Sequence, residues 1–168
     1  DTLTRVNKEI LNYFKDDNLE KYRDILIFRL FCFSGILPNE MASLTLNSFI
    51  FKDSMMFLKI EGNSESKNRE IPLPKEKLIR YYNKYIELRN PNAKSFFYNK
   101  DNKQIEVNLL SEIVKRLLEF CNVSARDKTP KMLRKTYALF LNNEKGKDGF
   151  TQPEQNIKYL LGLANTTQ

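Results

Sequence analysis

The chain has 168 residues, of which 41% are hydrophobic, so we expect residues 1–168 to form one domain with a single core. Lysine and arginine number 28 against 21 acidic residues, and the resulting net charge of +7 favours a polyanionic partner such as nucleic acid. The chain contains no histidine, which excludes imidazole as a metal ligand, a general base or the partner of a nucleophile.

The apolar segments predict neither a membrane anchor nor a signal peptide. The longest apolar runs, such as Ile25–Phe33, contain a charged residue and are shorter than the roughly 20 residues that cross a bilayer. Cys32 and Cys121 each lie inside an apolar run, where a free thiol behaves as a small buried side chain. We therefore expect a reduced, cytoplasmic protein without a membrane partner.

Helical spacing of apolar residues predicts three helices in the first quarter of the chain. The first covers Leu3–Phe14, and a denser, central helix covers Tyr22–Phe33. Gly35 follows in the position that favours a left-handed helix cap. A short helix over Asn39–Leu44, opened by Pro38, completes this part.

Three short β-prone runs come next. They cover Ser48–Lys52, Met55–Ile60 and Arg69–Leu73, and Asp53-Ser54 forms a turn between the first two. These runs predict three antiparallel strands. Helical periodicity then returns over Lys75–Leu88, so the sheet is small and flanked by helices.

The second half of the chain is predicted to be helical. Ser95–Tyr98 is a short apolar strand or turn, and Val107–Phe120 carries an apolar face typical of a long amphipathic helix. Further helices are expected over Lys131–Leu141 and Pro153–Leu161, with a glycine-containing break at 146–149 between them. The predicted fold class is α+β, mainly helical, with a small three-stranded antiparallel sheet.

Three segments, in the right order, resemble signature boxes of the tyrosine recombinases, the phage integrase family. Residues 128–138, Lys-Thr-Pro-Lys-Met-Leu-Arg-Lys-Thr-Tyr-Ala, are similar to the second box, where His-x-x-Arg opens a helix. Arg134 falls on the second catalytic arginine of that box. Phe33–Leu44 resembles the first box, Thr-Gly-Leu-Arg-x-x-Glu, and Glu40 matches its acid. Tyr159–Gln168 is similar to the segment in which Leu-Gly-His or Leu-Gly-Trp and Thr-Thr precede the nucleophilic tyrosine.

The segment Lys59–Leu73 resembles the family's second and third strands, whose connecting turn carries a catalytic lysine. Lys67 is the nearest candidate for that lysine, and Lys59 is the second. The resemblance covers nearly the whole chain and implies the catalytic-domain fold of a tyrosine recombinase. It also implies that an amino-terminal DNA clamp and the tyrosine itself belong to sequence beyond these 168 residues.

The resemblance implies a reaction on DNA that uses no metal or nucleotide cofactor. In the family, a tyrosine hydroxyl attacks a phosphodiester and leaves a 3′-phosphotyrosyl link. Two guanidinium groups clamp the transition state, and a lysine protonates the departing 5′-oxygen. The implied catalytic residues are Arg134, Lys67 and Lys131. The implied contacts to double-stranded DNA are Lys135, Arg69, Lys59 and Lys128, and the full-length protein is expected to form a tetramer on DNA.

Three positions depart from the family pattern. Leu37 stands where the first arginine belongs, Lys131 replaces the first histidine, and Leu163 replaces the second histidine or tryptophan. The loss of one preorganised donor of this kind typically lowers a rate by about 10²- to 10³-fold. We therefore expect binding to DNA to be better preserved than catalysis, and this chain to be inactive by itself.

Three functions remain in competition. The first is a recombinase with a degenerate site, serving integration, excision or resolution of a phage, plasmid or transposon. The second is a DNA-binding accessory or regulatory module on the same fold. The third is a helical protein-interaction domain whose lysines reflect an AT-rich genome.

Individual residues also have simpler interpretations. Lys67 could be a solvated lysine of a polar loop, Arg69 could face water instead of DNA, and Arg134 could be a surface arginine of a basic helix. Glu40 is interpreted as a structural acid that caps the short helix or pairs with a basic neighbour. Leu37 and Leu163 are interpreted as core-filling or interface residues.

Overall fold

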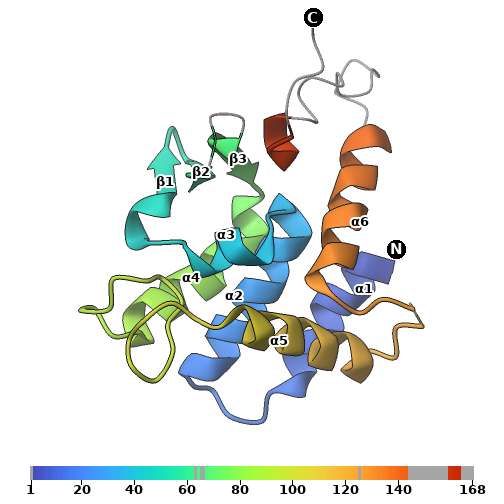
Figure 1. The fold of residues 1–168 in the computed structure, drawn as a ribbon. Helices are drawn as coiled ribbons and strands as arrows, with labels where there is room; N and C mark the ends of the chain where they lie inside the picture. The colour runs from blue at the N-terminus through green and yellow to red at the C-terminus, as the bar shows by residue number, and fades with distance from the viewer. Residues whose placement is uncertain (1, 63, 65–66, 125, 144–158, 164–168) are drawn as a thin grey trace, which may run out of the picture.

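The computed structural model describes residues 2–62, 64, 67–124, 126–143 and 159–163, which form a set of helices and a small sheet (Figure 1). The predicted fold class is confirmed: the architecture is mainly helical, and its three strands are antiparallel. Within these residues, every helix is too short or too polar to cross a lipid bilayer.

The amino-terminal helices are arranged around α2 (Leu19–Ser34), which packs against α4 on one side and α6 on the other (Figure 1). Its Asn18 cap accepts a hydrogen bond from the Lys21 backbone N–H at 3.1 Å. Ten of its sixteen residues are buried, as expected for a helix in the centre of a core. The expected first helix is instead α1 (Thr2–Glu9) followed by the 3₁₀-helix η1 (Ile10–Tyr13), whose tighter turn accompanies complete burial of Ile10.

The sheet and the short helix before it lie beside the carboxyl end of α2. Their bounds are α3 (Pro38–Ala42), the 3₁₀-helix η2 (Leu46–Ser48), β1 (Phe49–Lys52), β2 (Met55–Ile60) and β3 (Arg69–Leu73). The strand order is β1-β2-β3, and Leu58 of the central strand lies opposite Phe49 and Ile71. The predicted strands and their antiparallel pairing are therefore confirmed, while the short helix ends two residues before Leu44.

The later helices are α4 (Lys75–Leu88), α5 (Val107–Phe120) and α6 (Pro130–Asn143), and residues 159–161 form a further helical turn. Ser95–Tyr98 forms only isolated bridges, from Ser95 to Thr45 and from Tyr98 to Gln104. Most of the predicted helix Pro153–Leu161, and the break at 146–149, lie outside the described residues.

The carboxyl end of α2, the helix α6 and the 159–163 segment come together beside the sheet. Gly35 ends α2 with a φ of 64° and donates its N–H to the Phe31 carbonyl, which confirms the predicted left-handed cap. A Cβ at this position would lie 2.3 Å from the Tyr137 ring of α6, so the glycine also permits close contact between α2 and α6. Tyr137 and Leu141 pack in turn against Leu161. This junction positions the candidate site.

Candidate functional site

Arg134 lies in the second turn of α6, where main-chain oxygens hold its guanidinium group from two sides. Nη1 donates to the carbonyl of Gly35, and Nη2 donates to the carbonyl of Leu161 at 2.5 Å. A guanidinium has five N–H donors, so further donors remain for another acceptor once these two carbonyls are satisfied. The side chain is half-buried. Arg134 is thus fixed in place and still able to bind an anion.

Arg69, the first residue of β3, forms a buried ion pair with Glu40 of α3. Nη1 lies 2.8 Å from Oε2 and Nη2 lies 2.9 Å from Oε1, which is the paired, fork-like geometry that guanidinium and carboxylate favour. The side chains are 0% and 5% exposed, respectively. Water is therefore excluded from the pair, and each partner depends on the other for its counter-charge.

The remaining donors of Arg69 bind main-chain oxygens. Nε donates to Leu160 at 3.0 Å, and Nη1 donates to Lys67 at 2.8 Å. At Gly162, whose φ is 73°, a Cβ would lie 2.5 Å from the Arg69 Nη1 atom. Because the enclosed Arg69 guanidinium cannot move away, the close contact between it and the backbone of residue 162 requires glycine there. The Arg69 side chain therefore connects β3, α3 and the 159–163 segment.

Glu40 is held in its ionised form by its surroundings. Burial opposes ionisation, but bonds from Arg69 and from the Leu37 backbone N–H outweigh it and lower the pKa of the Glu40 carboxyl. The Leu37 N–H donates to Oε1 at 2.9 Å, which caps the start of α3. The structural interpretation of Glu40 is confirmed in both respects, since it caps the helix and pairs with a basic residue.

Electrostatics couples Arg134 to the ion pair. Burial, followed by the positive charge of Arg69, lowers the pKa of Arg134, and the negative charge of Glu40 opposes this shift. The same interaction with Arg134 contributes to the lowered pKa of Glu40. The two guanidinium groups and the carboxylate therefore form one charge cluster with a surplus positive charge.

The three lysines expected to contact DNA and the two expected catalytic lysines differ in position and exposure. Lys131 and Lys135 are exposed on α6, and Lys131 lies one turn before Arg134. Lys67 is half-buried two residues before β3, and its carbonyl accepts a bond from Arg69. Lys128 is half-buried in the loop before α6, and Lys59 is exposed on β2.

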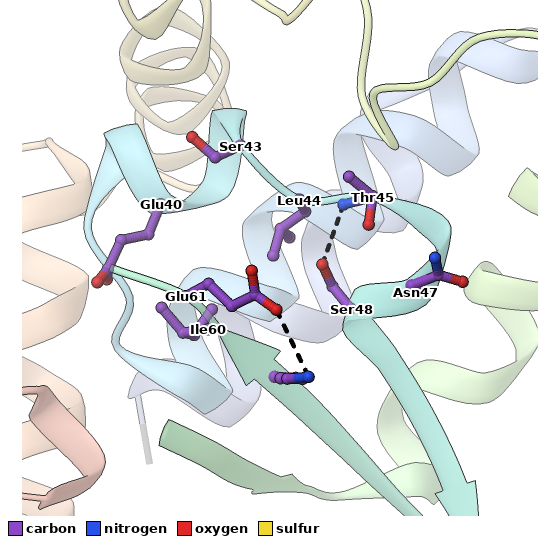
Figure 2. Close-up of a pocket in the computed structure, with 9 residues that line it drawn as sticks. Glu40, Ser43, Leu44, Thr45, Asn47, Ser48, Ile60 and Glu61 are labelled. Carbon is purple, nitrogen blue, oxygen red and sulfur yellow. Dashed lines mark hydrogen bonds and ion pairs between the residues drawn. The ribbon is translucent and has the colours of Figure 1, made fainter. Parts of the chain in front are cut away.

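A polar pocket of about 120 Å³, partly lined by Glu40, lies between α3, η2 and β2 (Figure 2). Hydroxyl groups line it, and that of Ser48 accepts a bond from the Thr45 backbone N–H at 3.0 Å. Lys59 borders the pocket but pairs with Glu61 at 3.5 Å. Since both lining carboxylates are negative and the lysine is already paired, the pocket is poorly suited to an anion.

The sequence and the fold match known proteins. The model of the phage integrase family matches residues 2–162. The chain belongs to the phage integrase family. No curated protein sequence matches it.

Solved tyrosine recombinases of this family have the same fold. The XerH site-specific recombinase bound to difH substrate has a TM-score of 0.79 at 18% identity, over 97% of this chain and 45% of the other. The XerA recombinase has a TM-score of 0.73 at 16% identity, over 95% and 54%. A lambda integrase dimer bound to a COC' core site has a TM-score of 0.64 at 14% identity, over 98% and 43%. The chain thus spans about half the length of these integrase-family proteins, and the resemblance in the sequence is confirmed.

Two departures from the integrase-family pattern have clear structural positions. Leu37, where the first arginine was expected, is half-buried at the start of α3 and offers its backbone N–H to Glu40. Leu163 is 45% exposed, so it does not fill the core as one of its two interpretations required. At both positions the side chain is aliphatic and offers no hydrogen-bond donor.

The expectation for Arg69 requires correction. Arg69 was expected either to contact DNA or to face water, but its side chain is 0% exposed and bound to Glu40. Its partner is 29 residues away along the chain, and the other contacts come from residues 160 and 67. No local pattern around Arg69 indicates this pairing. The interpretation of Glu40 as a structural acid that could pair with a basic neighbour was the one available signal of a basic partner.

Replacement of Glu40 by Gln should destabilise the protein in a pH-dependent way. Loss of the charge leaves Arg69 buried without a counter-ion, which typically costs about 3–5 kcal/mol. Because the Glu40 pKa is lower in the folded chain than its ordinary value of 4.5, its stabilising effect is complete above pH 4.5. That effect is lost as the pH falls through the folded pKa.

Urea unfolding at pH 7 and at several values below 4.5 measures the difference in unfolding free energy between wild type and Glu40→Gln. The difference should shrink towards acidic pH. Glu61→Gln is the matched control, because this exposed carboxylate pairs with the exposed Lys59 and should contribute less than about 1 kcal/mol. An equal difference at all pH values would contradict the role assigned to the Glu40 charge.

Proposed function

We propose that this chain binds double-stranded DNA, with the Arg134 guanidinium on a backbone phosphate. The observation that carries the proposal is the state of Arg134: two carbonyls fix the group, and donors remain for a phosphate oxygen. Lys131 and Lys135 are exposed on the same helix and supply further positive charge. The XerH and lambda integrase structures of the same fold are complexes with DNA, which supports this use of the scaffold.

Within this function, phosphate contacts are assigned to the accessible lysines. Lys131 and Lys135 lie nearest to Arg134 in the sequence of α6, so they are the first candidates. Lys128 lies at the entrance to this helix, and Lys59 would have to exchange its Glu61 partner for a phosphate. Arg69 is not included, because its guanidinium is fully enclosed. Contacts of this kind are independent of base sequence and set the strength and salt dependence of binding.

Site-specific recombination is the second candidate function and rests on membership of the integrase family. In that reaction Arg134 would bind the non-bridging phosphate oxygens, and Lys67 would protonate the departing 5′-oxygen. Lys131 would supply part of the charge missing at Leu37. The Tn1549 transposon integrase has the same fold with a TM-score of 0.65, so a mobile genetic element is a fitting source, and assembly on DNA would bring several copies together. DNA binding is favoured over catalysis because Leu37 and Leu163 carry no donor.

The number of phosphate contacts should appear in the salt dependence of binding. Wild type should bind a duplex with a steep decrease of log K against log salt, because counterions are released from the DNA. Lys131→Ala and Lys135→Ala should each reduce the slope by about 1, as measured by fluorescence anisotropy at several salt concentrations.

Lys84→Ala provides the matched control. Lys84 lies on α4, which α2 separates from α6, and it pairs with Glu87 at 3.8 Å (Figure 1). This variant should keep the wild-type slope. Binding that is insensitive to salt, or an equal change in all three variants, would contradict a phosphate surface on α6.

Covalent trapping separates the two candidate functions. The chain, extended by a nucleophilic tyrosine segment of the integrase family, is incubated with a nicked suicide duplex, and protein–DNA adducts are resolved under denaturing conditions. A binding module yields no adduct although it shifts the duplex. An adduct that disappears in Arg134→Ala, but persists in Lys84→Ala, would establish the recombinase function instead.

A further inference from the structure

The charge cluster contains one carboxylate, that of Glu40, and the two guanidinium groups of Arg69 and Arg134. Glu40 gives both of its oxygens to Arg69, at 2.8 and 2.9 Å. Arg134 is close enough for its charge to act on Glu40, yet within the described residues its guanidinium donates to the carbonyls of Gly35 and Leu161 and not to this carboxylate. The arrangement therefore assigns the carboxylate to Arg69 and leaves Arg134 with neutral acceptors.

The 159–163 segment holds the two guanidinium groups in their separate positions. Its successive carbonyls are shared between the two groups, since Leu160 accepts from Arg69 Nε and Leu161 accepts from Arg134 Nη2. The Tyr159 hydroxyl accepts a bond from the Glu70 backbone N–H at 2.9 Å, which fixes the same segment to β3. The two arginines are thus held side by side without sharing the carboxylate.

We propose that Arg69 is a positioning residue that keeps Glu40 away from Arg134, so that Arg134 retains its positive charge for a DNA phosphate. Without Arg69, Glu40 would be a buried carboxylate without its bound counter-charge, and Arg134 is the other described cation whose charge acts on it. The carboxylate would then bind Arg134 and compete directly with the phosphate, because both are oxyanions that accept paired N–H donors. The inference rests on the proposed DNA binding and explains how the site remains available.

Two further features are consistent with this role. Arg69 is enclosed, so it contributes to phosphate binding only through its effect on Glu40. Its other bonds hold the Lys67 carbonyl and the Leu160 carbonyl, so replacement would also loosen neighbouring backbone. An experiment must therefore separate the charge effect from general disruption, and Glu40 offers the means to do so.

The test measures the affinity of the 168-residue chain for a duplex in four proteins: wild type, Arg69→Met, Glu40→Met and the double variant. Arg69→Met should weaken binding by at least about tenfold, because Glu40 occupies Arg134. The double variant should recover most of that loss, since the competing carboxylate is absent and methionine side chains can fill the space of a buried ion pair. Arg69→Lys, which keeps a positive charge beside Glu40, should bind more tightly than Arg69→Met.

The contribution of Arg134 provides the decisive comparison. Arg134→Ala should lower affinity in wild type and in the Glu40→Met, Arg69→Met background, but should have little effect in Arg69→Met alone. Affinities are referred to the folded fraction from circular dichroism. If the double variant binds as weakly as Arg69→Met while folded, or if Arg134→Ala has the same effect in every background, the inference is wrong.

Arg89→Met is the matched control for the loss of a buried arginine. Arg89 is 4% exposed and bonds to the carbonyls of Ala93, Ser95 and Phe96, none of which belongs to α3 or β3. Its replacement should lower stability but leave the affinity per folded molecule unchanged. A tenfold loss of affinity in this control would show that any buried arginine gives the effect, and the inference would fail.

Failure of the proposed function is recognised separately. If wild type does not bind a duplex, or if Arg134→Ala has no effect on it, DNA binding through Arg134 is wrong whatever Arg69 does. Nuclear magnetic resonance of the arginine Nε–H groups then decides the inference without DNA. The Arg134 signal should shift in Arg69→Met and return in the double variant, and an unchanged signal would overturn the proposal.

Discussion

The buried ion pair between Arg69 and Glu40 is the interaction on which the site depends. It joins the first residue of β3 to the short helix α3, and through the Leu160 carbonyl it reaches the 159–163 segment. Ion pairs of this kind give little net stability compared with well-packed apolar side chains, but removal of one partner is costly. The pair is therefore better understood as a specification of geometry, because the observed arrangement of these three segments brings the two charges together.

The fixed position of the Arg134 guanidinium depends on the same arrangement of segments. The carbonyl of Gly35 is available to it because α2 ends in a left-handed glycine that permits close contact with Tyr137 of α6. The carbonyl of Leu161 is available because Gly162 allows the backbone to pass against Arg69. Two glycines with positive φ, far apart in the sequence, thus shape the surroundings of one guanidinium group. The outcome is a cation that is fixed but retains free donors.

Sequence patterns predicted most of the fold, because the relevant signals are local. Apolar periodicity places α4 and α5 at the residues observed, and the short β-prone runs predict the antiparallel pairing of β2 and β3. The 3₁₀-helix after α1 and the isolated bridges at Ser95 and Tyr98 were not predicted, since they depend on packing and on backbone contacts with distant residues. Local propensity does not contain that information.

The site was predicted less completely than the fold. Arg134 could be selected because its motif is contiguous, and the structure adds that its charge interacts with that of Glu40. The position of Arg69 could not be derived, because its burial results from a partner 29 residues away and a carbonyl 91 residues away. Aliphatic residues at Leu37 and Leu163 were visible in the sequence, and the structure adds that Leu163 faces solvent. These facts favour binding over catalysis in this member of the integrase family.

A crystal structure of the chain bound to duplex DNA tests the central claim most directly. The account predicts a phosphate oxygen within hydrogen-bond distance of the Arg134 guanidinium, while Arg69 remains paired with Glu40. DNA bound to another face of the molecule, or Glu40 paired with Arg134 in the complex, would contradict it.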